Sequence, residues 1–392
     1  MSTCCTPTAP TSSCTATPLA WFEASLSHCL EYVRSEHSQG RPIVGIMCEY
    51  TPRELILAAG ATPVCLCGGA QETIVDAETV LPVNLCPLIK STFGFHVRRA
   101  NPFLEIAALL VGETTCDGKK KMYEYMAQSR PMHILELPQK QNTPGGLDFW
   151  TCELRSFKAE LERRFDTAIT EESLRAAIAA MNRERALRRE LAALMARDAP
   201  PLTGRQLLQL RSAVSGIPLV IEKLEAALEY LRTAPVCEKS RRERVRVLLT
   251  GVPVVQGAER VVDLVEDHGG LIVCMENCTG VKPILEDVAV DAPDPIRALA
   301  EKYFHLPCPV MTPNVARLES LRSLIADYRV EAVIELVWVA CQTYDVESRG
   351  IKRLAEEELG IPYLRIETDY SPSDSARIAV RVEALMETAR QR

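Results

Sequence analysis

Two stretches of the chain, 41–139 and 244–392, each alternate short apolar runs with helical patterns. The apolar runs are PIVGIM, TPVCLC, EIAALLV and MHILEL in the first stretch, and RVRVLLTG, LIVCM, EAVIELVWV and IPYLRI in the second. Alternation of strands and helices is typical of a parallel sheet with helices on both faces. We therefore predict an α/β fold in which the same plan occurs twice.

The cysteines of the two stretches fall in comparable places. NLCP corresponds to HLPCP, ETTCDGKKK to WVACQTYDVES, and PVCLCGG to IVCMENCTG. Cys86 and Cys116 are 30 residues apart, and Cys308 and Cys341 are 33 apart. Order, context and spacing agree, so we predict two related, doubly wound, flavodoxin-like parallel-sheet domains.

Between these stretches, 152–235 has the leucine and alanine spacing of helices with charged outer faces, interrupted by the prolines at 200 and 201. We assign a helical bridging segment to it. The predicted organisation is a disordered tail over 1–20, a first α/β domain over 21–150, the bridging segment over 151–240 and a second α/β domain over 241–392. The tail is rich in Thr, Ser and Pro and lacks the basic and apolar regions of a secretory signal.

Composition restricts the partners. The chain has 392 residues and a net charge of −7, so nothing supplies the basic surface that nucleic acid requires. No apolar run approaches the roughly 20 residues that span a bilayer. We expect a cytoplasmic protein that binds neither nucleic acid nor a membrane.

Fifteen cysteines are many for a chain of this size. Reduced thiols in a large cytoplasmic protein serve as metal ligands, as catalysts or as small buried hydrophobic residues. The tail cysteines Cys4, Cys5 and Cys14 are set aside, together with Cys29, Cys152 and Cys237.

Six cysteines follow predicted strands or lie in the adjoining loops. Ligands of doubly wound sheets bind at the carboxyl ends of the strands, so facing domains could bring these six into one cleft. They are Cys48, Cys86, Cys116, Cys278, Cys308 and Cys341. A helix predicted to start at Gly118, with Lys119 and Lys120, would favour the thiolate of Cys116.

The same segment is not a phosphate-binding loop. Five residues separate Gly112 from Gly118, where that loop needs four, and Lys120 stands where it needs Ser or Thr. Structural zinc sites use close cysteine pairs, and only Cys274 and Cys278 come near that spacing. Isolated cysteines spread over two domains suit an iron–sulfur cluster better. The alternative is that they are buried core residues.

Two helix starts have a local signature. In CEYTPRELILAAGA, Thr51 suits the N-cap, Pro52 the first helical position, and Glu54 would complete a capping box. The helix within 312–328 should begin near Thr312 or Asn314.

Several motifs resemble the family of 2-hydroxyacyl-CoA dehydratase and benzoyl-CoA reductase subunits. They are CEYTPRELILAAGA, LPVNLCPLIKSTFG, ETTCDGKKKMYE, ENCTGVKP, DPIRALAEKYFHLPC and IPYLRIETDYSPSDSARIAVRVEA. The resemblance covers nearly all of 41–390 and is strongest to the double-cubane-cluster branch of anaerobic reductases.

The resemblance implies an oxygen-sensitive protein with iron–sulfur between two α/β domains. It implies Cys86, Cys116 and Cys341 as ligands of a [4Fe–4S] cluster. A double cubane, [8Fe–9S], needs further thiolates, for which Cys48, Cys278 and Cys308 are the candidates and Cys274 is the rival. The implied partner is a separate ATP-hydrolysing iron–sulfur activator, and a homodimer is expected.

Three functional hypotheses follow. The favoured one is an ATP-dependent, low-potential reductase component that acts on a small molecule. The second is a subunit that removes water from an (R)-2-hydroxyacyl-CoA through a ketyl radical. A cluster carrier or activator-binding scaffold without turnover is the non-enzymatic alternative.

Some residues beside the proposed ligands could handle protons or substrate. Glu113, Glu276 and Tyr344 are the candidates, although each could instead hold a ligand in place by hydrogen bonding. Residues 119–121 form either a basic patch that docks the activator or an ordinary solvated helix face.

Overall fold

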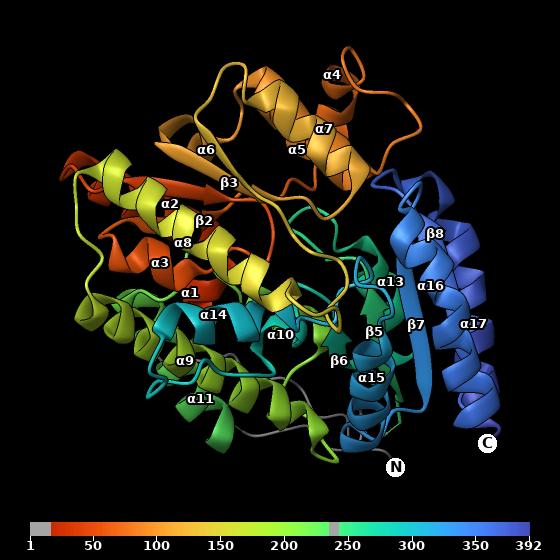
Figure 1. Cartoon of the computed structure of the whole chain (residues 1–392). Coiled ribbons are helices and arrows are strands. Elements are labelled where there is room, and N and C mark those ends of the chain that lie inside the picture. The colour runs from red at the N-terminus through yellow and green to blue at the C-terminus, as the bar shows by residue number, and fades with distance from the viewer. Residues whose placement is uncertain (1–16, 235–242) are drawn as a thin grey trace, which may run out of the picture.

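The protein contains two four-stranded parallel sheets, one in each repeat of the predicted plan (Figure 1). The computed structural model describes residues 17–234 and 243–392. The first sheet has the order β2-β1-β3-β4 and the second the order β6-β5-β7-β8. The strands are β1 (Ile43–Ile46), β2 (Thr62–Cys65), β3 (Leu109–Glu113), β4 (Met132–Leu135), β5 (Val245–Gly251), β6 (Gly270–Glu276), β7 (Ala332–Trp338) and β8 (Tyr363–Thr368). The two orders are equivalent, which confirms the prediction of two flavodoxin-like sheets.

The first sheet is buried on both faces. Ile43 of β1 and Met47 directly after it belong to one core cluster, whereas Val44 and Ile46 belong to the other, as expected for the alternating side chains of an extended strand. One face is covered by α3 (Arg53–Ala58), α8 (Gly146–Phe165), the start of α9 (Glu171–Ala193) and α14 (Pro295–Phe304). The other is covered by α2 (Ser25–Ser38), α5 (Pro87–Arg98), α6 (Pro102–Ile106) and α7 (Asp117–Met126). We call these strands and their flanking helices the first half.

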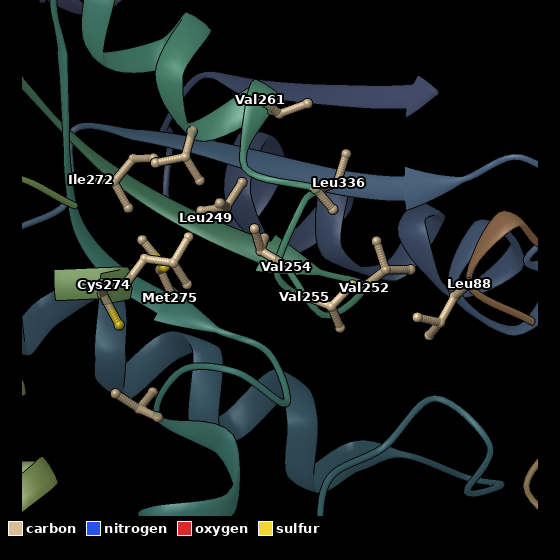
Figure 2. Packing of buried hydrophobic residues seen from close by; sticks show 14 of the residues in the cluster. Leu88, Leu249, Val252, Val254, Val255, Val261, Ile272, Cys274, Met275 and Leu336 are labelled. Carbon is tan, nitrogen blue, oxygen red and sulfur yellow. The ribbon is translucent and has the colours of Figure 1, made fainter. Parts of the chain in front are cut away.

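The second half has its own sheet but shares a core with the first. Its helices are α10 (Gly204–Gln209), α13 (Arg260–Asp267), α15 (Val315–Asp327), α16 (Gln342–Arg353) and α17 (Ser375–Arg390), whereas α11 (Pro218–Thr233) packs on α9. Figure 2 shows Val252 and Val255 of this half in the same buried cluster as Leu88 of α5. The hydrophobic effect therefore holds the two sheets together as well as each sheet separately.

The helices between the two sheets contact both of them. Helix α8 packs on β4, and α10 packs on β6. Helix α14 follows β6 in the sequence, yet it packs on α8 and α9 beside the first sheet. Of the tail predicted over 1–20, residues 1–16 lie outside the described residues, and α1 (Ala20–Glu23) begins at its end.

The predicted capping box is wrong. Helix α3 begins at Arg53, its N-cap is Pro52, and no side chain caps it. The hydroxyl of Thr51 donates instead to Glu113, and Glu54 pairs with Arg185. At α15 the N-cap is Asn314, as expected, but its amide donates to Glu347 rather than capping the helix. In both places a carboxylate distant in the sequence was the stronger partner.

Glycines allow the loops of the two halves to meet closely. A Cβ atom on Gly69 would lie 2.3 Å from the carbonyl oxygen of Gln256, and one on Gly257 would lie 2.8 Å from that of Gly69. Nearby, the hydroxyl of Tyr370 donates to the carbonyl of Gly68 at 3.2 Å. Backbone contact therefore fixes the halves at this junction.

None of the helices within 17–234 and 243–392 combines the length and apolarity needed to cross a membrane.

Candidate functional site

Most of the predicted ligand cysteines lie at the carboxyl ends of strands. Cys48 follows β1, Cys278 follows β6, and Cys116 and Cys341 are the N-cap residues of the helices after β3 and β7. Cys86 is the N-cap of α5. Cys308 lies in the loop after α14, and all six thiols are free. In both sheets the strand order reverses beside the first strand, which is where doubly wound sheets bind their ligands.

Cys48, Cys278 and Cys308 form one set of thiols, which we call the Cys48 group. Burial raises the pKa of Cys48, and the neighbouring Cys278 and Cys308 raise it further. Burial likewise raises the pKa of Cys278 to about 12, with Cys308 adding to the shift. The hydroxyl of Tyr50 is close to all three thiols. Cys48 and Cys308 pack against the core of the first half, whereas Cys278 follows β6 of the second half, so this group spans the junction.

Cys86 and Cys341 form a second contact across the junction. A hydrogen bond between their thiols raises the pKa of Cys86 and lowers that of Cys341, since Cys86 keeps the shared proton. Cys116 is half-buried and packs against the same core as Cys341. We call these three the Cys86 group. The structure brings Cys86 and Cys341 together, and Cys116 joins the group because the motifs imply it as the third ligand.

Lys119 is a half-buried cation that lies close to both groups. Its ammonium donates to the carbonyl of Met47 at 2.9 Å. Burial lowers the pKa of Lys119, but Cys48 and other anionic neighbours outweigh this, so its pKa is raised well above the ordinary value. It also lowers the pKa of Cys341. A fixed cation here favours thiolate on both sides.

The lysine run therefore divides between the interior and the surface. Lys120 pairs with Asp117 at 3.0 Å and Lys121 with Glu124 at 2.7 Å, and the side chains of both lysines reach solvent. Only these two residues fit the predicted basic patch or solvated face. Lys119 does not belong to it, because the helix turns this side chain towards the thiols.

Glu113 is fully buried at the end of β3. One carboxylate oxygen accepts a hydrogen bond from Thr51, and the other has no partner among the described residues. Burial raises the pKa of Glu113 to about 7. This carboxyl group can therefore hold or release a proton near neutral pH.

Glu276 and Tyr344 belong to a buried charged network in the second half. Glu276 pairs with Lys282 at 3.0 Å and with Arg317 at 3.3 Å. Burial raises the pKa of Glu276, but the two cations outweigh it and leave the pKa below its ordinary value. Lys282 donates to the hydroxyl of Tyr344 at 3.3 Å, and Arg317 lies 5.1 Å from the centre of its ring.

This network lies next to the cysteines of the Cys48 group. Arg317 also contacts Thr250, Glu335 and Glu347 and is fully buried. Tyr344 follows Cys341 by three residues and is close to Cys278 and Cys308. Glu276 is therefore placed as a fixed charge, whereas Tyr344 is placed beside the thiols.

Cys274 lies apart from the six candidates. It is inside β6, and its sulfur lies in the second-half core (Figure 2). Burial raises its pKa, and its ionisable neighbours are Glu276 and Asp327 rather than other thiols. It lines a cavity of about 40 Å³ with Met275 and Tyr328.

Two thiols that sequence reasoning did not select lie at the site. Cys65 is the last residue of β2, Cys67 follows two residues later, and the two thiols are hydrogen-bonded to each other. The Cys67 thiol donates to the carbonyl of Met47 at 3.6 Å and is close to Lys119 and Cys48. The correspondence between PVCLCGG and IVCMENCTG could have pointed to them, because the second motif contains Cys278.

The donor set is suited to iron–sulfur rather than to one ion. Within the described ranges, no three His, Cys, Asp or Glu side chains are arranged to hold a single metal ion. The thiols instead form two sets at the junction, and thiolate is the ligand that iron–sulfur clusters take from proteins. Several buried polar groups beside them have no partner among the described residues, among them Tyr123 and Asn277. Thiol ligands with unpaired polar groups around them fit a bound cluster.

Comparison with known proteins agrees with the motifs. A family model described as the 2-hydroxyglutaryl-CoA dehydratase D-component matches residues 48–389. The chain is 41% identical over 356 residues to "Putative dehydratase subunit YjiM" of Escherichia coli (strain K12), a match that covers 89% of this chain and 92% of that protein. It is 22% identical to the (R)-phenyllactyl-CoA dehydratase beta subunit of Clostridium sporogenes, over 94% of this chain and 97% of that one. It is 24% identical to a subunit of the benzoyl-CoA reductase of Thauera aromatica, over 69% and 70%. The chain therefore belongs to the 2-hydroxyacyl-CoA dehydratase and benzoyl-CoA reductase family.

Proposed function

We propose that the chain is the iron–sulfur component of an ATP-dependent, low-potential reductase that acts on a small molecule. The observation that carries the proposal is the pair of thiol groups at the junction of the halves. The Cys86 group supplies three thiols for one cubane, and the Cys48 group supplies three more for a second. A double cubane would then lie between the two halves. When bound, it would supply electrons at low potential.

The residues of the chain would position and neutralise that cofactor. Lys119 compensates the negative charge of the thiolates of both groups. The Lys282 and Arg317 network holds Tyr344 behind Cys278 and Cys308. Glu113 has a pKa of about 7 and can hold a proton beside Cys48.

The proposed electron donor is a separate ATP-hydrolysing iron–sulfur protein, and we propose a homodimer as the working form. Val83 and Val346, three and five residues from Cys86 and Cys341 in the sequence, are 69% and 75% exposed, and we propose that the donor contacts the chain near them. The segment 112–120 does not have the spacing of a phosphate loop, which is consistent with ATP hydrolysis by a partner.

A second candidate is a dehydratase subunit with one [4Fe–4S] cluster, held by Cys86, Cys116 and Cys341. The names of two relatives favour it, since one is a subunit of an (R)-phenyllactyl-CoA dehydratase and YjiM is also named as a dehydratase subunit. The number of iron atoms separates the two candidates.

The test is iron and acid-labile sulfide in protein purified without oxygen. About eight iron atoms per chain support the double cubane, and about four support the single cubane. Cys48→Ser should reduce eight iron to about four under the first proposal and change nothing under the second. Cys274→Ala, which alters a thiol in the core, serves as the control and should keep full iron. A wild-type chain without iron after anaerobic reconstitution would refute both candidates.

Activity is tested next, with the ATP-hydrolysing partner present. Consumption of electrons that depends on both ATP and an added small molecule supports a reductase. Release of water from an (R)-2-hydroxyacyl-CoA supports the dehydratase. If the cluster is reduced in an ATP-dependent way but neither reaction occurs, the chain is a cluster carrier without turnover.

A further inference from the structure

Two buried hydrogen-bond donors at the site have no partner among the described residues, one in each half. They are the hydroxyl of Tyr123 and the side-chain amide of Asn277. Both residues are fully buried. Buried donors are almost always hydrogen-bonded in folded proteins, so each of these needs a specific explanation.

Tyr123 comes from α7 and lies over the end of β3. A Cβ atom on Gly112 would be 2.6 Å from the Cε2 and Cζ atoms of its ring, so only glycine leaves room for the ring there. Its ionisable neighbours include Lys119, Glu113 and Cys48. The hydroxyl therefore lies among the groups that surround the Cys48 thiol, without a bond to any of them.

Asn277 stands between the end of β6 and Cys278. Its Oδ1 accepts from the backbone N–H of Thr279 at 3.1 Å and from the Thr279 hydroxyl at 2.9 Å. These two bonds fix the orientation of the amide, because an oxygen is required to accept them. The Nδ2 group is left as a donor next to a proposed ligand, and no acceptor for it lies within the described residues.

We infer that Tyr123 and Asn277 donate hydrogen bonds to sulfur atoms of the bound cluster, one from each half. The inference rests on the proposed iron–sulfur cofactor and assigns it two positioning residues. A donor to sulfur stabilises the reduced state, which carries more negative charge, and so raises the reduction potential. It also explains why both donors are unpaired when only the chain's own groups are considered.

Tyr123→Phe is the sharper test, because it removes one oxygen atom and keeps the buried ring. In reconstituted protein we expect full iron content and a more negative reduction potential, measured by redox titration followed by electron paramagnetic resonance. In the metal-free chain we expect no loss of stability in denaturant, because the hydroxyl has no bond to lose. The matched control is Tyr303→Phe, whose hydroxyl donates to Glu54 at 2.8 Å. That variant should lose stability without a shift in potential.

Asn277→Asp tests the second donor. The aspartate keeps the oxygen that accepts from Thr279 and replaces the donor with a negative oxygen, so the potential should again become more negative. Asn101→Asp is the control, since the Oδ1 of Asn101 also accepts backbone bonds, from Phe103 and Leu104, at the amino-terminal side of β3. The same charge added there should leave the potential unchanged.

Outcomes separate this inference from the proposed function. If the wild type binds iron but Tyr123→Phe and Asn277→Asp keep its potential, the donors serve another purpose and the inference is wrong. Equal destabilisation of the metal-free Tyr123→Phe and Tyr303→Phe chains would also overturn it, because it would mean that Tyr123 is already bonded. A wild type without iron would overturn the proposed function itself.

Discussion

The two halves place a buried glutamate at the end of a strand in very different surroundings. Glu113 ends β3, Glu276 ends β6, and each accepts a hydrogen bond from a threonine hydroxyl. Glu276 has two buried cations as partners, whereas one oxygen of Glu113 has no partner among the described residues. The pKa of Glu276 is therefore lowered and that of Glu113 is raised to about 7. The same strand arrangement thus gives a carboxylate that stays charged in the second half, Glu276, and one that titrates near neutral pH in the first half, Glu113.

The largest effect is expected when Arg317, the buried cation that Glu276 and its neighbours share, is replaced. Arg317→Met would leave Glu276, Glu335 and Glu347 without their shared partner. We expect a loss of about 3–5 kcal/mol in the free energy of unfolding, since removing one partner of a buried ion pair leaves the other charge buried and unpaired. Chemical denaturation of the metal-free chain measures it.

The control lies on the same helix. Arg322 pairs with Glu358, and both side chains are at least 40% exposed. Arg322→Met should cost less than about 1 kcal/mol, as for other surface pairs. Equal losses in the two variants would mean that the network is not the structural element that distinguishes the second half.

The raised pKa of Glu113 is tested by measuring the stability of the folded chain as a function of pH. The ordinary pKa of a glutamate is 4.5, and that of Glu113 in the folded chain is about 7. Between these values the folded chain binds more protons than the unfolded chain, so stability falls as pH rises through this range and is level above it. The loss from this group is about 3 kcal/mol, from 1.36 kcal/mol for each pKa unit. Glu113→Gln should abolish that part of the decline, measured by denaturation from pH 5 to pH 8.

Glu276→Gln should show the opposite behaviour. The pKa of Glu276 is lowered, so its stabilising effect is present at neutral pH and is lost as the pH falls through the lowered value. The variant should be less stable than the wild type at pH 8, and the difference should shrink in acid. Parallel pH profiles for the Glu113 and Glu276 variants would remove the distinction between the halves.

The smallest expected loss of stability concerns the backbone contact between the two halves. Gly69→Ala would bring a Cβ atom to within 2.3 Å of the Gln256 carbonyl, so the backbones of the two halves would have to separate. We expect a loss of about 1–3 kcal/mol, as for other overpacked sites. Gly350→Ala is the control, because its Cβ would meet nothing closer than 3.9 Å within α16. It should be neutral or stabilise the helix by up to about 1 kcal/mol.

Much of the fold could be predicted from the sequence because it depends on local patterns. The strands follow from short apolar runs, and the positions of Cys48, Cys116, Cys278 and Cys341 follow from their place after those runs. Parallel sheets bring such positions together whatever the details of packing. This explains why the two flavodoxin-like sheets were predictable from one sequence.

The errors concern residues whose partners are distant in the sequence. Thr51 has the local signature of a cap, but Glu113, 62 residues away, offers a buried carboxylate. Lys119 could not be separated from Lys120 and Lys121 by composition, because only the turn of α7 decides which lysine faces inward. Arg317 was not identified, since its carboxylate partners lie on β6, β7 and α16.

The return of α14 to the first sheet has a consequence for fragments of this protein. Leu299, Tyr303 and Phe304 complete the core over one face of that sheet, although they come after β6 in the sequence. A fragment ending near residue 234 would therefore expose this face, and one starting near residue 243 would carry an apolar helix with nothing to cover it. The chain consists of two sheets in space, but neither contiguous part of its sequence is an autonomous folding unit.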